Sequence, residues 1–296
     1  MRAAYDLPAM TDDFAGAVVE WYAGAKRSLP WREPGCSAWG VLVSEFMLQQ
    51  TPVARVLPAW TGWMQRWPTP SALAAEPAGD AIRAWGRLGY PRRALRLHAA
   101  AVAIRDAHGG EAPLDPAVLR TLPGVGDYTA AAVAAFAGNA RVAVLDTNVR
   151  RVYARVFDGA ADAGPGSPTV AERSAASARI PDPPGDYSVA VMELGALVCT
   201  ARSPRCDACP VAGACAWLAA GRPAADRPRR TQIYAGTDRE VRGRLLAVLR
   251  ACPGHVAAAE LDLAWPDATQ RHRALAGLVA DGLVEHAGAG SYRLPG

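Results

Sequence analysis

Hydrophobic residues recur at helical spacing along most of the chain, whereas runs with strand-like alternation are short. We expect helices over residues 11–25, over 38–50 and in several segments between 54 and 110. The 38–50 helix is apolar on almost every face, so it should be buried. Ser37 is placed to cap its first turn, and Pro52 stops it. The pattern therefore predicts a mainly α-helical protein.

A tight turn and a carboxylate lie close together between residues 122 and 148. The turn, Leu122-Pro123-Gly124-Val125-Gly126, contains two glycines, which can adopt backbone angles closed to other residues. An alanine-rich helix follows, so the turn's N–H groups and the helix N-terminus suit a phosphate. An apolar run then leads to Asp146, an expected N-cap of the next helix. For this stretch alone, an ordinary helical hairpin with a capping aspartate is the alternative.

Glu45 lies on an apolar face of the 38–50 helix, four residues after Val41 and three before Leu48. A buried carboxylate without a cation has a raised pKa and can hold a proton near neutral pH. A general acid needs this property. The structural alternative is a glutamate paired with a buried arginine.

Four cysteines at C-x6-C-x2-C-x5-C spacing form the most specific metal signal: Cys199, Cys206, Cys209 and Cys215. Four thiolates in a short segment suit an iron–sulfur cube or a structural zinc ion. The long first gap and the lack of a nearby histidine favour the cluster. Cys36 and Cys252 are isolated and are interpreted as plain thiols.

The C-terminal segment follows a proline-rich basic linker, 222–235. We expect helices near 238–251, 256–264 and 268–281, and then a β-hairpin, as in a small winged helix. From Gly236 onward the chain has seven arginines and seven acidic residues, which weakens a strong role in reading DNA. Packing on the main body or binding of a protein partner is an equal alternative.

Charge and residue usage narrow the classes of function. The net charge of +4 falls entirely within residues 1–235, which mildly favours a nucleic-acid partner for this part. Lys26 is the only lysine, so Schiff-base chemistry has almost no amine to use. Neither an apolar signal segment nor an uncharged stretch of about 18 residues occurs, and we expect a cytoplasmic, nucleoid-associated protein.

With Glu45, the glycine turn, Asp146 and the four cysteines in this order, the chain resembles the helix-hairpin-helix DNA glycosylases of the endonuclease III superfamily. The resemblance covers about residues 10–220 and is closest to the MutY-type, A/G-specific adenine glycosylases. The segment 44–51, SEFMLQQT, is similar to the one holding that family's general acid and intercalating residue. Tyr128 stands where enzymes with lyase activity place a Schiff-base lysine.

The resemblance implies an all-α fold of two domains, an iron–sulfur loop and an added winged-helix-like domain. The six-helix domain with the hairpin would span 30–136, and the cluster domain would combine 1–29 with 137–221. The linker would span 222–235 and the last domain 236–296. The protein is expected to be a monomer.

The resemblance also implies a reaction: removal of adenine mispaired with 8-oxoguanine or guanine in duplex DNA, by hydrolysis without strong lyase activity. Glu45 would protonate the base and Asp146 would stabilise the cationic sugar. Tyr128 and Asn148 would orient the two carboxylates or the sugar. The cofactor would be a [4Fe-4S] cluster on the four cysteines. The residues expected to line the base pocket or to bind DNA are Arg27, Trp31, Arg32, Leu48, Gln50, Thr51, Tyr90, Gly124, Val125 and Gly126.

Some features depart from the family pattern. Val189 stands where MutY-type enzymes usually carry a glutamine or glutamate that contacts adenine. The segment 146–148 reads DTN rather than DGN. The Nudix-like C-terminal domain that reads 8-oxoguanine is replaced by about 60 residues, which predicts weaker discrimination between 8-oxoguanine and guanine. The alternatives are a glycosylase for thymine or an oxidised pyrimidine, and a non-catalytic iron–sulfur regulator that binds DNA.

Overall fold

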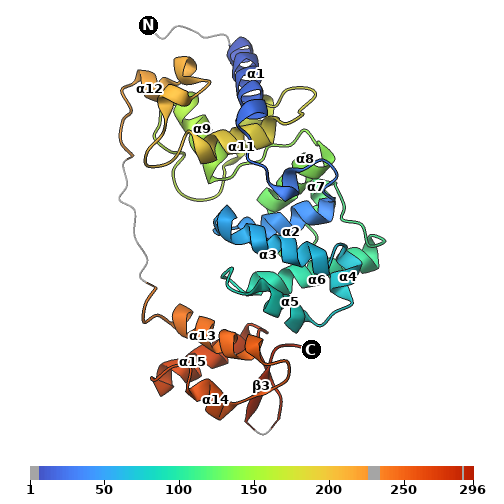
Figure 1. Cartoon of the computed structure of the whole chain (residues 1–296). Helices are drawn as coiled ribbons and strands as arrows, with labels where there is room; N and C mark the ends of the chain where they lie inside the picture. The colour runs from blue at the N-terminus through green and yellow to red at the C-terminus, as the bar shows by residue number, and fades with distance from the viewer. Residues whose placement is uncertain (1–6, 226–233, 289) are drawn as a thin grey trace. The chain divides into compact units, whose positions relative to one another are not determined.

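The computed structural model describes residues 7–225, 234–288 and 290–296, which fold into two compact units (Figure 1). The first unit combines residues 1–36, 114–116 and 126–228. The second combines residues 37–113, 117–125 and 229–296. The chain thus leaves the first unit after residue 36, returns to it briefly at 114–116 and again from Gly126, and ends in the second. The predicted linker lies partly outside the described residues.

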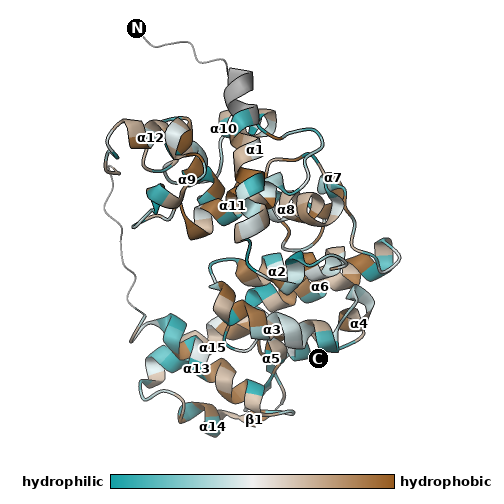
Figure 2. Cartoon of the chain, turned by 45° about the horizontal axis from the view of Figure 1, so that its top comes forward, coloured by the Kyte–Doolittle hydropathy of each residue, from teal (hydrophilic) through white to brown (hydrophobic). Residues whose placement is uncertain are grey.

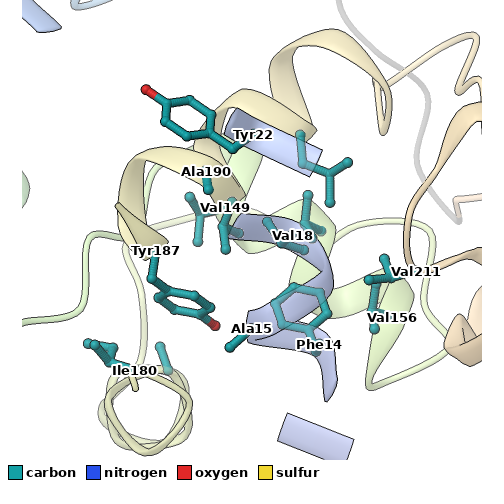
Figure 3. Close-up of a cluster of buried hydrophobic side chains, with 14 of the residues drawn as sticks. Phe14, Ala15, Val18, Tyr22, Val149, Val156, Ile180, Tyr187, Ala190 and Val211 are labelled. Atoms are coloured by element: carbon teal, nitrogen blue, oxygen red, sulfur yellow. The ribbon is translucent and has the colours of Figure 1, made fainter. Parts of the chain in front are cut away.

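The first unit is built from helices around one apolar cluster. Its main helices are α1 (Leu7–Ala25), α8 (Asp127–Gly138), α9 (Thr147–Val156), α10 (Val170–Ala178), α11 (Tyr187–Leu197) and α12 (Ala216–Ala219). Figure 3 shows Phe14, Val18 and Tyr22 of α1 lying against Val149 of α9 and Tyr187 of α11. The first helix, the helix beginning after Asp146 and the helix before the cysteines therefore share a core.

The second unit contains the predicted buried helix, α2 (Ala38–Leu48), in which residues 39–47 are all buried. Ser37 caps it as expected, accepting the Gly40 backbone N–H at 3.2 Å. The other helices are α3 (Val53–Arg66), α4 (Pro70–Ala74), α5 (Ala78–Trp85), α6 (Arg92–Ala107) and α7 (Pro116–Leu119), the last of which begins in the first unit. The indole of Trp63 packs edge-to-face on Trp67 and Trp85, which closes the core.

The C-terminal part contains α13 (Asp238–Ala251), α14 (Ala258–Asp262) and α15 (Ala268–Ala280) with a three-stranded sheet. The expected hairpin is present as β2 (Glu285–His286) and β3 (Ser291–Arg293). The prediction of one helix over 256–264 is wrong at its start, because Val256–Ala257 form a strand, β1, antiparallel to β3. β-branched Val256 pairs with Tyr292, and such cross-strand packing outweighs the local helical pattern.

Hydropathy varies around the helices, with hydrophobic and hydrophilic residues interleaved along them (Figure 2). Among the described residues, no helix is both long and apolar enough to cross a membrane.

Candidate active site

The predicted general acid, Glu45, lies in α2 of the second unit and is only 5% exposed. Leu48 ends the helix and is half-buried. The next residues turn sharply, since Gln50 has a φ of 57°, in the left-handed region that is uncommon for a residue other than glycine. Gln50 is exposed, whereas Thr51 is buried and its Oγ1 donates to the Leu88 carbonyl at 3.2 Å. The helix end therefore presents Gln50 outward on an anchored turn.

A second loop, between α5 and α6, lies against the end of α2. Tyr90 also has a positive φ, 46°, and its side chain is exposed. The Arg93 guanidinium donates to the Gln49 carbonyl and lies 4.5 Å from the centre of the Tyr90 ring. Gln50 and Tyr90, the two residues predicted to fill or wedge an opened base stack, therefore belong to loops that Thr51 and Arg93 tie together.

The glycine turn before α8 needs only one of its two glycines for conformational reasons. Gly124 has a φ of 80°, and a Cβ there would lie 2.7 Å from the Cβ of Arg96. Gly126 has an ordinary φ of –100° and open space around it, so the expectation of two special glycine conformations is wrong for Gly126. Val125 is buried, and Gly126 is the N-cap of α8 without a side-chain cap. The first N–H groups of α8 consequently have no capping side chain at Gly126 to which they could donate.

In the first unit, Asp146 is the N-cap of α9, as predicted. One carboxylate oxygen accepts the Val149 backbone N–H at 2.7 Å, and the other accepts the Asn148 side-chain amide at 2.7 Å. Burial raises the pKa of Asp146 above 3.8, while these hydrogen bonds and the nearby Arg151 charge act in the opposite direction. Asp146 is thus a carboxylate held in a fixed orientation and poorly solvated, the state in which its negative charge acts most strongly on a nearby cation.

The Asn148 side chain connects Asp146 to the cysteine segment. Its Oδ1 accepts a hydrogen bond from Arg151 at 2.8 Å, and Arg151 also donates to the Gly195 and Cys199 carbonyls, both at 2.7 Å. A Cβ on Gly195 would lie 2.8 Å from the Cβ of Asn148, so α11 approaches α9 closely at this point. A chain of hydrogen bonds therefore runs from the predicted catalytic carboxylate to the first cysteine.

Arg27 and Arg32, predicted to belong to a base pocket, converge on Glu193 of α11. Arg27 donates to the two Glu193 oxygens at 2.7 Å each, and Arg32 donates at 2.7 Å to one of them. The Glu193 side chain has no exposed surface. Burial opposes its ionisation, but the hydrogen bonds and charges of the two arginines outweigh this effect and lower its pKa from 4.5 to about 2. One carboxylate thus neutralises one of two guanidinium charges, and the cluster keeps a net positive charge.

The other residues discussed for the site, Trp31, Tyr128 and Val189, are buried or half-buried against the first unit's apolar side chains or beside Arg32. Trp31 is buried at 5% exposure beside Arg32. Tyr128, half-buried on α8, packs against a small cluster that includes Val144 and Met192. Val189 packs on the main core of the first unit. Tyr128 thus contacts a cluster that contains both the segment before Asp146 and helix α11.

The four cysteines follow α11 and line one cavity, together with Arg155, Leu194 and Trp217 among others. Among the described residues, no three histidine, cysteine or carboxylate side chains are already gathered as metal ligands. The thiols are nevertheless close enough to affect one another: burial, with smaller contributions from the other three cysteines, raises the pKa of Cys209 to about 11. Bound iron would reverse this, because a coordinated thiol is deprotonated. Four thiols facing one cavity fit a [4Fe-4S] cluster as a donor set.

Arg155 adds a buried positive charge to the cysteine cavity. It is 3% exposed, donates to the Cys199 Sγ at 3.4 Å and to the Thr200 carbonyl at 2.8 Å, and lies 4.3 Å from the Trp217 ring. Its own carbonyl accepts from the Cys215 Sγ at 3.6 Å. Arg155 therefore contacts the first and last of the four cysteines.

Sequence reasoning did not single out Glu193, Arg151 or Arg155. Glu193 lies in the apolar segment YSVAVMELGALV, so it carries the same signal that identified Glu45, an acidic residue within an apolar helix. Arg151 and Arg155 belong to the arginine-rich segment VRRVYARVF, and residue spacing alone does not predict their buried contacts.

The helical architecture, the glycine turn and the cysteine loop together define a class of protein. The model for the HhH-GPD superfamily of base excision DNA repair proteins matches residues 43–172. The model for the iron–sulfur binding domain of endonuclease III matches residues 199–215. Among solved structures, a thermostable thymine-DNA glycosylase has a TM-score of 0.66 at 23% identity, covering 72% of this chain and 98% of that chain. An endonuclease III–DNA covalent intermediate has a TM-score of 0.58, also at 23% identity, covering 72% and 99%. At this identity the two structures support the fold.

Curated relatives give a narrower assignment. An adenine DNA glycosylase of Mycobacterium tuberculosis is 56% identical, covering 94% of this chain and 92% of its own. That of Mycolicibacterium smegmatis is 54% identical, covering 94% and 95%. The human adenine DNA glycosylase is 42% identical over 68% of this chain and 39% of its own. The chain belongs to the adenine DNA glycosylase family.

Proposed function

We propose that this enzyme removes adenine mispaired with 8-oxoguanine or guanine from duplex DNA, by hydrolysis of the bond between the sugar C1′ and the base N9. The observation that carries the proposal is a pair of carboxylates shielded from solvent: Glu45, buried in the second unit, and Asp146, partly buried in the first. The sequence relationship to adenine DNA glycosylases supports adenine as the base.

Glu45 acts as the general acid. It donates a proton to N7 of a flipped-out adenine, and the electron pair of the breaking C1′–N9 bond moves to the base, which leaves neutral. Flipping costs about a few kcal/mol. The 5% exposure of Glu45 supports this role, because a carboxyl group within an apolar helix is shielded from exchange with bulk water.

Asp146 stabilises the positive charge that develops on the sugar as the base departs. A poorly solvated carboxylate, held by the Val149 N–H and Asn148, interacts strongly with a cation and needs no reorganisation. Water then adds to C1′ and loses a proton, which leaves an abasic site. Tyr128 at the lyase position and the single lysine, Lys26, support hydrolysis without strand cleavage.

DNA is held by the glycine turn, the α8 N-terminus and the loops carrying Gln50 and Tyr90. The main-chain N–H groups of Gly124 and Gly126 bind phosphate. Gln50 and Tyr90 are exposed at positive φ values, which supports their insertion into an opened base stack. The cluster on the four cysteines fixes their loop and supplies one-electron chemistry when bound, while Arg151 and Asn148 connect that loop to Asp146.

The proposal is tested with duplexes containing A·8-oxoguanine, A·G, T·G or thymine glycol, each incubated with enzyme and analysed with and without alkali. We expect release from the two adenine mispairs only, with strand breaks appearing only after alkali. Glu45→Gln should lower the single-turnover rate by about 10²-fold or more while DNA affinity is kept. Glu20→Gln, an exposed glutamate of α1, is the matched control. Thymine release, breaks without alkali, or a fully active Glu45→Gln would each contradict the assignment.

A further inference from the structure

The C-terminal domain, residues 234–296 as far as they are described, is anchored on α5 within the second unit. Arg250 of α13 donates to the Ile82 carbonyl at 3.0 Å, and burial lowers its pKa to about 10. Arg83 of α5 donates to the Cys252 carbonyl at 2.8 Å in the opposite direction. A partly buried arginine from each side thus binds the main chain of the other, which fixes the domain more firmly than exposed ion pairs would.

The end of the chain adds a contact that depends on a glycine. The Gly79 N–H donates to the Pro295 carbonyl at 2.8 Å, and a Cβ on Gly79 would lie 2.6 Å from that oxygen. The neighbouring Leu294 is 4% exposed. The chain end is therefore seated closely on α5.

At the other edge of this contact, α13 approaches the Tyr90 loop. Asp281 forms ion pairs with Arg92 at the start of α6, at 3.0 Å, and with Arg242 of α13. One turn before Arg242, the Arg239 guanidinium lies 5.8 Å from the centre of the Tyr90 ring, on which Arg93 also packs. The C-terminal domain thus brings an arginine to the residue proposed to wedge into DNA.

Several exposed arginines lie near Tyr90 in the sequence or in space: Arg87, Arg92, Arg96 and Arg239. Arg92 is also paired with Asp281. Farther along the C-terminal domain, Arg244 is paired with Glu240 and Arg273 with Asp238. Arg96 also lies against Gly124 of the phosphate-binding turn. The positive surface therefore continues from the glycine turn, past Tyr90, onto α13.

We propose that Arg239 extends the DNA-binding face onto the C-terminal domain by contacting a backbone phosphate of the duplex beside Tyr90. The inference rests on the proposed function, because it takes Tyr90 as a residue that meets DNA. Duplex DNA is the occupant that fits: it is a regular array of anions, and the surface is a row of guanidiniums with an exposed aromatic ring among them.

The test is the salt dependence of binding to an adenine-containing duplex, with Arg239→Gln compared with Arg244→Gln as the control on the same helix. Loss of one phosphate contact should reduce the slope of log K against log[salt] by about 0.9 in Arg239→Gln and leave it unchanged in Arg244→Gln. The single-turnover rate at saturating enzyme should stay unchanged. An identical slope for wild type and Arg239→Gln would overturn the proposal.

A Tyr90→Leu background separates a phosphate contact from mere support of the ring. If Arg239 binds phosphate, Arg239→Gln lowers the slope in this background as well. If its effect disappears there, Arg239 acts only through Tyr90 and the proposal fails. Adenine release by the wild type is measured separately. If adenine is not released but Arg239→Gln changes the slope, the proposed reaction is refuted and the proposed phosphate contact is kept. If adenine is released normally but the slope is unchanged, the reaction is kept and the phosphate contact is refuted.

Discussion

Asp146, which is partly buried, and Glu193, which is fully buried, are carboxylates of the first unit whose surroundings shift their pKa values in opposite directions. Asp146 is bound mainly by a backbone N–H and an amide, and burial raises its pKa. Glu193 is also buried, yet two guanidiniums lower its pKa to about 2. Neutral hydrogen-bond donors orient a carboxylate and leave much of its charge uncompensated, whereas paired arginines neutralise it. The first arrangement suits chemistry, and the second suits the positioning of the arginines.

The largest effect is expected for Asp146→Asn. The amide keeps the N-cap but removes the negative charge, so the single-turnover rate should fall on the order of 10³-fold. Because the folded pKa of Asp146 is raised above 3.8, its ionisation costs stability as pH rises through that folded pKa. Asp146→Asn should therefore be more stable than wild type at pH 7, and this gain should shrink as pH falls through the folded pKa and vanish below the unfolded value of about 3.8. Chemical denaturation across pH measures it; equal stability at both pH values would contradict the stated environment.

Glu193→Gln tests the other carboxylate and should mainly change stability. Removing the charge leaves two arginines unneutralised at a buried site, which typically costs about 3 kcal/mol. The lowered pKa means that the stabilisation from Glu193 is fully present above its unfolded value of 4.5 and is lost as pH falls towards about 2. The difference in unfolding free energy between wild type and variant should narrow over that range. Glu20→Gln serves as the exposed control, and a pH-independent difference would show that the ion cluster is not its source.

Arg155 extends the comparison to a buried cation, and its substitution is expected to change the rate of iron release only several-fold. A cubane with four thiolate ligands carries a net negative charge, and Arg155 contacts two of the ligand residues. Arg155→Gln should release iron to a chelator several-fold faster than wild type, because a charged hydrogen-bond donor contributes about 1.5–3 kcal/mol. Arg202→Gln, an exposed arginine of the same loop, should release iron at the wild-type rate. Equal release by the two variants would show that the charge of Arg155 does not hold the cluster.

Local signals in the sequence predicted much of this molecule. Ser37 and Asp146 cap the expected helices, because the capping preference depends on a few neighbouring residues. The cysteine spacing predicted the iron–sulfur site, and the apolar pattern of residues 38–50 predicted the burial of α2. The small strand β1 was not, since its stability comes from pairing with β3, about 35 residues later along the chain.

The site itself was only partly predictable. The roles proposed for Glu45 and Asp146 followed from residue type, position and the family resemblance, but the pairing of Arg27 and Arg32 with Glu193 joins residues more than 160 positions apart. The special backbone conformation expected for Gly126 was wrong, because a glycine motif does not say which member adopts the unusual conformation. The contact between Arg239 and Tyr90 depends on how one domain packs on another, which no local pattern specifies.

The single lysine has a practical consequence. Lys26 is exposed, lies 5.7 Å from the centre of the Tyr22 ring, and immediately precedes Arg27 of the Glu193 cluster. An amine-reactive fluorophore has no other lysine to modify. The α-amino group can first be blocked near neutral pH, and the lysine side chain can then be labelled at a pH well above 8. A dye at this position would report, without any engineered cysteine, on events beside the residues proposed to receive the flipped base.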